Sequence, residues 1–311
     1  MTSHIGEFAA LAVAFAWTIT ALSFEYAAKR VGSLNVNLIR LPLALVYLAI
    51  FTFFTRGNAL PTDATGHQWI WLLLSGVVGF VIGDLFLFKA FVNIGSRFSM
   101  LIMTLVPPIT AFLGWLFLDE FLTWFYLLGM VLTVSGIFLA LNAHKDGDTN
   151  KFSKHSIRGI FYAIGGALGQ AGGLILSKIG MQNYNPFAST QIRIIAGVVG
   201  FALIMVFMGR IKQGVEALKN KEGMKGILIG SFFGPFIGVS LSLVAVQYTN
   251  TGVVSTIMSI VPILIIPPSI IFFKQKVSWI EMIGALLSVI GVALFFVDQV
   301  AFMAFVNRVL G

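Results

Sequence analysis

Residues 103–141 read "MTLVPPITAFLGWLFLDEFLTWFYLLGMVLTVSGIFLAL", and residues 258–296 read "MSIVPILIIPPSIIFFKQKVSWIEMIGALLSVIGVALFF". A shift of 155 residues places the second run on the first without a gap. The coinciding positions include Met103/Met258, Pro107/Pro262, Phe117/Phe272, Trp124/Trp279, Gly129/Gly284 and Gly136/Gly291. Chance similarity between apolar segments would explain shared leucine and valine, but not shared proline, tryptophan and glycine. We therefore infer that the chain is an internal duplication.

The repeat extends toward the start of each half. Gly79 and Gly83 fall on Gly234 and Gly238 at the same shift, and at a shift of 153 "LIRLPLA" (38–44) meets "QIRIIAG" (191–197). Arg40 then coincides with Arg193. We predict a first repeat over 1–141, a basic connecting loop over 142–157, a second repeat over 158–297 and a short C-terminal tail over 298–311.

The composition indicates a helical membrane protein. Hydrophobic residues make up 58% of the chain and charged residues 10%, whereas a soluble domain needs a larger polar fraction to cover its surface. Apolar stretches of about twenty residues, long enough to cross the hydrocarbon core as helices, recur from end to end. The predicted spans are 6–28, 36–55, 69–91, 97–118, 122–141, 158–179, 187–209, 226–248, 252–273 and 278–297. Cysteine is absent, which excludes disulfides and thiol chemistry.

Each half holds five predicted spans, and because five is odd, the second half must be inverted relative to the first. The loop charges agree, since lysine and arginine favour the cytoplasmic side. The 1–2 loop carries Lys29 and Arg30, whereas its counterpart over 180–186 has no basic residue. The 2–3 loop has only Arg56, but its counterpart over 210–225 has five basic residues. The predicted fold is therefore an all-α polytopic protein with ten transmembrane helices in two inverted repeats, and the charges place both termini outside the cytoplasm.

Three segments carry a family resemblance: "GDLFLFKAFVNIGSRFS" (83–99), "LGWLFLDE" (113–120) and "GALGQAGGLILSKIG" (166–180). With the two five-helix halves, they resemble the drug/metabolite transporter superfamily, EamA type. The resemblance implies a ten-helix basket around a central cavity in the plasma or inner membrane. It also implies secondary-active transport of a small organic metabolite, such as an amino acid, by alternating access, with export as the expected direction. Family members often place both termini in the cytoplasm, and the loop charges of this chain depart from that habit.

The resemblance and the residues together define the expected partners. These are a small-molecule substrate and the lipid bilayer, with no nucleic acid, and the chain is expected to be a monomer or a weak homodimer. No cofactor is expected, and coupling to protons stays open.

Ionisable residues within spans are costly unless they face partners or water, so they are the first functional candidates. Chain direction places Glu25, Arg40, Lys89 and Arg97 toward one membrane face, with Asp84 nearer the middle. We interpret this set as a gate or a substrate contact; the alternative is a salt bridge that fixes the hairpin of spans 3 and 4. Asp84 and Lys89 lie about 140° apart around a helix, so they cannot both face one cavity. Neutralising Asp84 is expected to impair transport without unfolding the protein.

Other candidates have a structural alternative of equal or greater weight. Glu25 could simply pair with Lys29 one turn later. For Arg40 and its equivalent Arg193 we favour arginines that reach the membrane interface or anchor a loop. The remaining substrate-contact candidates are Lys178, which is the counterpart of Glu25, the hydrogen-bonding residues Gln170, Gln247 and Tyr248, and Trp17 as an apolar wall.

Proline and glycine predict local mechanics. Pro107, Pro108, Pro262 and Pro267 remove backbone donors, so spans 4 and 9 should kink and present free carbonyls toward the cavity. The alternative is a fixed kink that only shapes the bundle. Gly230, Gly234 and Gly238 share one helix face, which predicts close packing of span 8 against a neighbour.

Two other classes of function fit the sequence less well. A membrane-embedded enzyme acting on a lipid-like substrate would need acidic clusters or nucleophilic dyads at membrane depth, and the four histidines, His4, His67, His144 and His155, all fall near termini or in loops. A passive channel would need a ring of like groups, whereas the charges here differ between the halves.

Overall fold

The computed structural model describes residues 4–142, 154–265, 267–268 and 278–294, and these residues form no strand. The helices of the first half are α1 (Ile5–Val31), α2 (Ser33–Arg56), α3 (Gly66–Gly76), α4 (Asp84–Met103), α5 (Val106–Leu118) and α6 (Trp124–Asn142). Those of the second half are α7 (Lys154–Met181), α8 (Pro186–Phe207), α9 (Ile211–Ala217), α10 (Lys221–Ser231), α11 (Val239–Tyr248), α12 (Thr251–Met258), α13 (Val261–Leu264) and α15 (Trp279–Ala293). Two π-helical segments, η1 (Val77–Gly83) and η2 (Phe232–Gly238), join α3 to α4 and α10 to α11.

These helices fall on all ten predicted spans. Within the described residues, six helical stretches are long and apolar enough to cross a membrane, and Val106–Leu118, Trp124–Leu139 and Met282–Val292 are shorter apolar helices. Large apolar side chains such as Phe54, Phe207, Trp124 and Trp279 are exposed on the outside of the bundle, as expected for surfaces that face lipid and its interface. The all-α polytopic fold is therefore confirmed. The short helix α9, which lies in the 7–8 loop, is not expected from the sequence.

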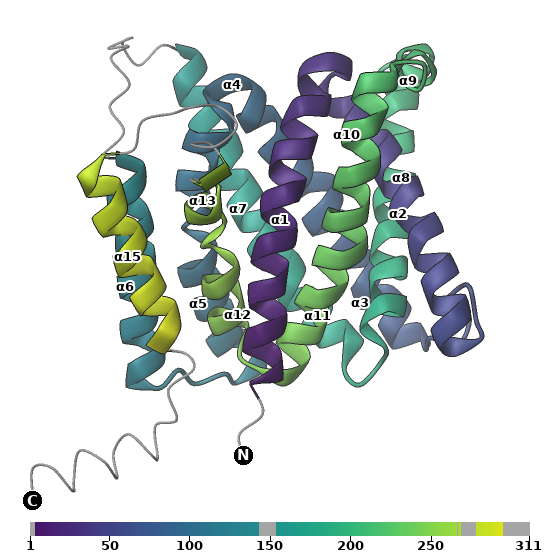
Figure 1. Ribbon diagram of the computed structural model, residues 1–311. Coiled ribbons are helices and arrows are strands. Elements are labelled where there is room, and N and C mark those ends of the chain that lie inside the picture. Colours follow the sequence, from purple (N-terminus) through teal and green to yellow (C-terminus); the bar gives the residue numbers. More distant parts are fainter. Residues whose placement is uncertain (1–3, 143–153, 266, 269–277, 295–311) are drawn as a thin grey trace, which may run out of the picture.

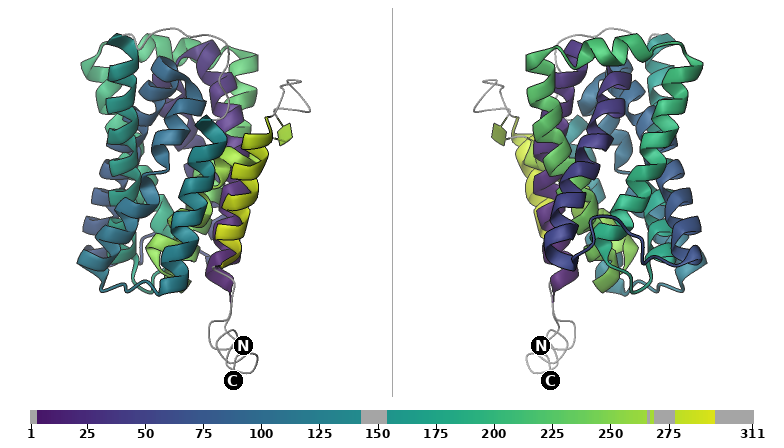
Figure 2. Two further views of the ribbon diagram at one scale, coloured as in Figure 1. Left: turned by 90° about the vertical axis from the view of Figure 1, so that its left-hand side faces the viewer. Right: turned by 90° about the vertical axis from the view of Figure 1, so that its right-hand side faces the viewer.

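The two halves run in opposite directions through the bundle. In Figure 1, α1 rises from the lower end to the upper end, whereas its repeat counterpart α7 descends. The same holds for α6, which rises, and its counterpart α15, which descends beside it. The start of α1 and the end of α15 therefore lie at the same end of the molecule, and both views in Figure 2 show the long helices aligned along one axis. This is the inverted repeat that the odd span number requires.

The halves interlock, because the first helix of each half packs against the third span of the other. α1 lies against α10, η2 and α11, and α7 lies against α3, η1 and α4. Glycines allow the close approach: a Cβ added to Gly169 would stand 2.5 Å from the Cα of Gly83, and one on Gly173 would stand 2.8 Å from that of Gly79. In the opposite pair, Gly234 and Gly238 face Thr20 and Trp17 of α1. The predicted glycine face of span 8 therefore meets α1.

Counterpart helices also pair directly. The fifth spans, α6 and α15, pack along their length. At their crossing the Ser288 hydroxyl donates to the Thr133 carbonyl at 3.2 Å, and the Thr133 hydroxyl lies 3.5 Å from the Ser288 carbonyl. Thr133 and Ser288 are 155 residues apart, so the contact is symmetric about the axis that relates the two repeats.

The third spans break regular α-helix at equivalent places. Both η1 and η2 are seven residues long, and each residue of η2 lies 155 positions after its counterpart in η1. A π-helical turn widens the helix and often marks a functional segment. Here each π segment ends immediately before a cavity residue: Asp84 follows η1, and Val239 follows η2.

The fourth and ninth spans are broken at equivalent positions, after Met103 and after Met258. Pro107 stands in the first turn of α5 and Pro262 in the first turn of α13, where a missing N–H group costs little. Each span is thus interrupted just before its proline, which opens the next helix, and the kink of spans 4 and 9 stays a prediction. Pro108 shares the first turn of α5, and Pro267 is exposed beyond α13.

Candidate functional site

A cavity of about 170 Å³ lies inside the bundle. Because a single ordered water needs about 10–15 Å³ of such space, this volume has room for a small organic molecule. Both halves contribute to the lining in repeat-equivalent pairs. These pairs are Trp17/Gln170, Ala21/Leu174, Arg40/Arg193, Gly79/Gly234, Phe80/Pro235, Asp84/Val239, Leu87/Ser242, Met103/Met258, Thr104/Ser259 and Val106/Val261. The cavity therefore lies on the axis that relates the repeats.

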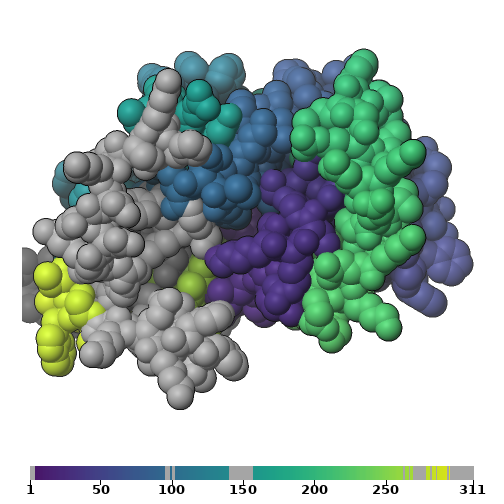
Figure 3. Space-filling model, turned by 90° about the horizontal axis from the view of Figure 1, so that it is seen from above, coloured from purple at the N-terminus to yellow at the C-terminus, as the bar shows by residue number. Residues whose placement is uncertain are grey.

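The cavity reaches toward the upper end of the bundle in Figure 1. Its lining on α1 runs from Trp17 to Phe24, and on the first part of α4 from Asp84 to Phe91, with Met103 at the end of α4. Both α1 and the first part of α4 rise to the upper end. Figure 3, seen from above, shows the atoms of α1, in purple, beside blue atoms of the first half at this end.

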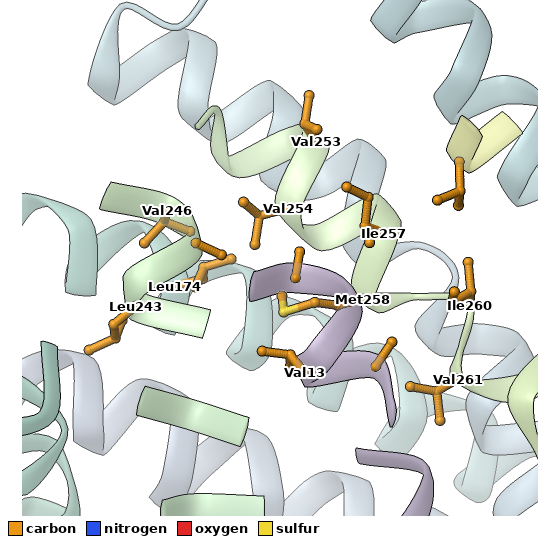
Figure 4. Close-up of a cluster of buried hydrophobic side chains, with 14 of the residues drawn as sticks. Val13, Leu174, Leu243, Val246, Val253, Val254, Ile257, Met258, Ile260 and Val261 are labelled. Carbon is orange, nitrogen blue, oxygen red and sulfur yellow. The ribbon is translucent and has the colours of Figure 1, made fainter. Parts of the chain in front are cut away.

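Below the cavity, the bundle is packed solid. Figure 4 shows Val13, Leu243, Val254 and Ile257 among the side chains that converge from α1, α11 and α12. All four are fully buried. Leu174 and Met258 belong both to this cluster and to the cavity lining, so they form its floor. The cavity is thus closed by apolar packing toward the end that carries the start of α1.

The polar centre of the cavity is Asp84. Its carboxylate pairs with the Arg40 guanidinium through Oδ2 and accepts a hydrogen bond from Gln170 Nε2 at 2.8 Å through Oδ1. Arg40 Nε donates to the side chain of Asn37 at 2.9 Å, which fixes the guanidinium. Asp84 is 4% exposed and Arg40 5%. A buried charge pair needs such additional hydrogen bonds to offset its desolvation, and α2, α4 and α7 supply them together.

Arg193, on α8, lies near the same Phe80 ring as Arg40. Its Cζ is 5.1 Å from the centre of the Phe80 ring, and the Cζ of Arg40 is 6.0 Å from the same centre. Arg193 is 6% exposed, and its Nε is buried without a hydrogen-bond partner. The prediction that Arg40 and Arg193 reach the membrane interface is therefore wrong. Both point into the protein, where Arg40 pairs with the Asp84 carboxylate and each guanidinium lies near aromatic rings.

The rest of the wall is largely apolar, with both aromatic and aliphatic side chains and scattered hydroxyls. Phe24 and Phe88 lie on Arg40, at 5.4 and 5.0 Å from ring centre to Cζ. Trp17 also lines the cavity, as predicted for an apolar wall. Thr104 and Ser259 stand at the two helix breaks. An apolar surface with a few fixed polar groups is typical of a small-molecule site.

The missing proline donors also concern cavity residues. In a continuous helix, the N–H groups of residues 107, 108 and 262 would donate to the carbonyls of Met103, Thr104 and Met258. Proline has no N–H group, and all three of these residues line the cavity. For Met103 and Met258, the expectation that carbonyls are freed near the cavity stays a prediction.

A second polar cluster joins the lower ends of three hairpins. Lys178 Nζ, at the end of α7, pairs with Glu120 Oε1 at 2.6 Å and donates to the Thr249 carbonyl at 3.1 Å. Glu120 Oε2 accepts from both the backbone N–H and the hydroxyl of Thr251, at 2.8 and 2.6 Å. We call Glu120, Lys178, Thr249 and Thr251 the lower latch. It ties the α5–α6 loop and the α11–α12 loop to α7 beneath the apolar floor.

Several predicted site residues lie away from the cavity. Lys89 is exposed, and its Nζ lies 5.5 Å from the ring centre of Tyr162. Glu25 pairs with Lys29 at 2.7 Å on the outer end of α1, which is the simpler of its two interpretations. Gln247 is half-buried and Tyr248 is 58% exposed at the end of α11, so neither lines the cavity. The Arg97 backbone lies in α4, and its side chain and that of Pro262 are outside the described residues.

Two groups that matter here were not expected from the sequence. Glu120 belongs to the quoted "LGWLFLDE" and comes just after span 4, yet it is only 9% exposed and both of its carboxylate oxygens accept hydrogen bonds. In the sequence, Phe80 is one aromatic residue among many, since only the fold brings two arginines near its ring. In the sequence, Glu120 comes just after one apolar span and Lys178 lies at the end of another. These two positions are the only features of the sequence from which their pairing could have been predicted.

Comparisons with known proteins agree with this architecture. The model of the EamA-like transporter family matches residues 4–142 and again residues 157–297. The uncharacterized transporter YoaV of Bacillus subtilis (strain 168) is 27% identical over 135 residues, which cover 43% of this chain and 46% of that protein. The chain thus matches about half the length of this curated relative. A solved crystal structure shares the fold with a TM-score of 0.71 at 14% identity, over 93% of this chain and 95% of that chain.

Proposed function

The chain belongs to the EamA-like transporter family, and from this premise we propose that it is a secondary-active transporter of a small organic metabolite. The observation that supports this most directly is the cavity itself. It lies on the axis between inverted repeats, equivalent residues of both halves line it, and among the described residues apolar packing closes it toward the end that carries the start of α1.

Alternating access follows from that symmetry. In inverted-repeat carriers, the two halves exchange conformations, so that the closed end opens as the open end closes. Equivalent breaks in the third, fourth, eighth and ninth spans supply bending points on both sides of the cavity. The lower latch would have to open in the exchange. By the repeat, Lys178 corresponds to Glu25 and Glu120 to Gln275, which lies outside the described residues. A glutamate and a glutamine cannot form the same ion pair, so we expect the two ends to close by different chemistry.

We propose export as the direction, as the family resemblance implies, and the loop charges give the orientation of the cavity. They place the upper end of Figure 1, toward which the cavity reaches, on the cytoplasmic side. A substrate would then load from the cytoplasm in the described conformation. The aromatic wall and the few polar groups favour a compound with an apolar body, such as an amino acid or a related metabolite.

Purified protein in liposomes tests this function. We would first find ligands by thermal-shift screening against a metabolite library, and then measure flux of the best ligand into proteoliposomes. Saturable uptake that is accelerated by unlabelled substrate on the opposite side supports a carrier. An ohmic current without saturation would mean a channel, and chemical conversion of the ligand would mean an enzyme; either result would overturn the proposal.

A further inference from the structure

The two halves of the cavity differ in charge at one pair of equivalent positions. Arg40 and Arg193 coincide in the repeat, and both line the cavity. Asp84, the partner of Arg40, has Val239 as its counterpart, and Val239 also lines the cavity. The ionisable residues of the lining are thus two arginines and one aspartate, with a formal net charge of +1.

Arg193 lacks the partner that its counterpart has. Its guanidinium rests on the Phe80 ring and beside the backbone of Gly79, and the structure gives it no hydrogen-bond acceptor among the described residues. Its buried Nε has no partner. Leaving a buried guanidinium without an acceptor is costly. A protein that keeps one at the edge of a cavity has a place where an incoming anion is stabilised.

We propose that Arg193 binds the carboxylate of the transported molecule, at the place where the second half lacks a counterpart of Asp84. A guanidinium holds a carboxylate through paired N–H donors, and one negative charge balances the +1 of the lining. The aromatic wall, with Phe24, Phe88 and Phe91, receives the apolar body of the same molecule. The substrate class is therefore a small organic monocarboxylate. This inference rests on the proposed transport function and deepens it.

The Val239 position gives a test that does not depend on removing the arginine. Val239→Asp places a carboxylate where the repeat symmetry puts the partner of Arg193, so it should fill the site from within the protein. Val239→Asn is the matched control, because it has nearly the same shape and no charge. The probes are acetate, butyrate, phenylacetate and indole-3-acetate, each compared with its neutral amide by calorimetry on the purified full chain.

We expect at least one carboxylate to bind the unmodified protein about tenfold or more tightly than its amide, since bonds to a charged group are worth that factor. Val239→Asp should abolish this preference, and Val239→Asn should keep it. Arg193→Gln should abolish it and Arg193→Lys retain part of it; if Arg193→Gln does not fold, the two Val239 variants decide. Equal binding of every acid and its amide would overturn the proposal, as would equal effects of Val239→Asp and Val239→Asn. Binding of inorganic phosphate in place of all four carboxylates would overturn the substrate class.

The flux assay separates this inference from the function on which it rests. Saturable transport of an amide or a cation by a protein that binds no carboxylate would overturn the role of Arg193 and leave the carrier intact. Carboxylate binding that Val239→Asp abolishes, in a protein without saturable flux of any ligand, would overturn the carrier and leave the binding site intact.

Discussion

Breaking the Asp84–Arg40 pair should destabilise the protein strongly. The two groups are 4% and 5% exposed, so Asp84→Asn would leave the Arg40 charge buried without its counter-ion. Removing one partner of a buried pair costs about 3–5 kcal/mol in soluble proteins. The carboxylate uses one oxygen for Gln170 and the other for Arg40. Asparagine has one oxygen, so its NH₂ group would face one of these two donors and could not accept from it. Burial therefore changes the expectation drawn from sequence, in which Asp84→Asn spared the fold.

Thermal unfolding in detergent, followed by tryptophan fluorescence, measures this cost. By the scaling for large soluble domains, 3–5 kcal/mol corresponds to a fall in Tm on the order of 5–15 °C. The double variant Asp84→Asn/Arg40→Gln should recover part of the loss, because it removes the uncompensated charge. Lys89→Gln on the same helix is the control, since its exposed side chain should change stability by less than about 0.5 kcal/mol. A Tm for Asp84→Asn that stays close to that of Lys89→Gln, with no recovery in the double variant, would refute the reasoning.

Three further predictions concern packing, the lower latch and orientation. Gly169→Ala should destabilise the protein by about 1–3 kcal/mol in the same assay, because its Cβ would stand 2.5 Å from the Cα of Gly83. The control Gly172→Ala should be nearly neutral, because its Cβ meets only the end of the Val78 side chain, at 3.3 Å. Equal losses of stability in the two variants would count against close helix packing. Glu120→Gln should weaken the lower latch and change the rate of substrate exchange in proteoliposomes, whereas Glu216→Gln, at an exposed position in α9, should not. Identical exchange rates in the two variants would show that the lower latch has no part in transport. Because the chain has no cysteine, single introduced cysteines can report its orientation in the membrane. A membrane-impermeant maleimide added to intact cells should label Asn58→Cys and not Lys219→Cys. The reverse pattern would show that the orientation inferred from the loop charges is wrong.

The architecture follows from the amino-acid sequence alone. Apolar stretches of spanning length dictate transmembrane helices, because the bilayer core offers backbone groups no water. Two similar halves with an odd number of spans must be inverted, so a gap-free alignment and a parity argument are sufficient for the fold. The equivalence of Arg40 with Arg193, and the replacement of Asp84 by Val239, also follow from aligning the two halves.

The direction of the side chains depends on how the helices pack. Near the end of a span, an arginine that reaches the interface and one that points inward look alike in sequence, and the partners of Arg40 come from α2, α4 and α7 together. The choice between Asp84 and Lys89 depended on which helix face meets α7, and the glycines of α7 and η1 set that contact. The lower latch likewise joins three hairpins that are far apart along the chain. Sequence periodicity determines how residues are arranged around one helix, but the pairing of charges depends on how helices from both halves surround the cavity.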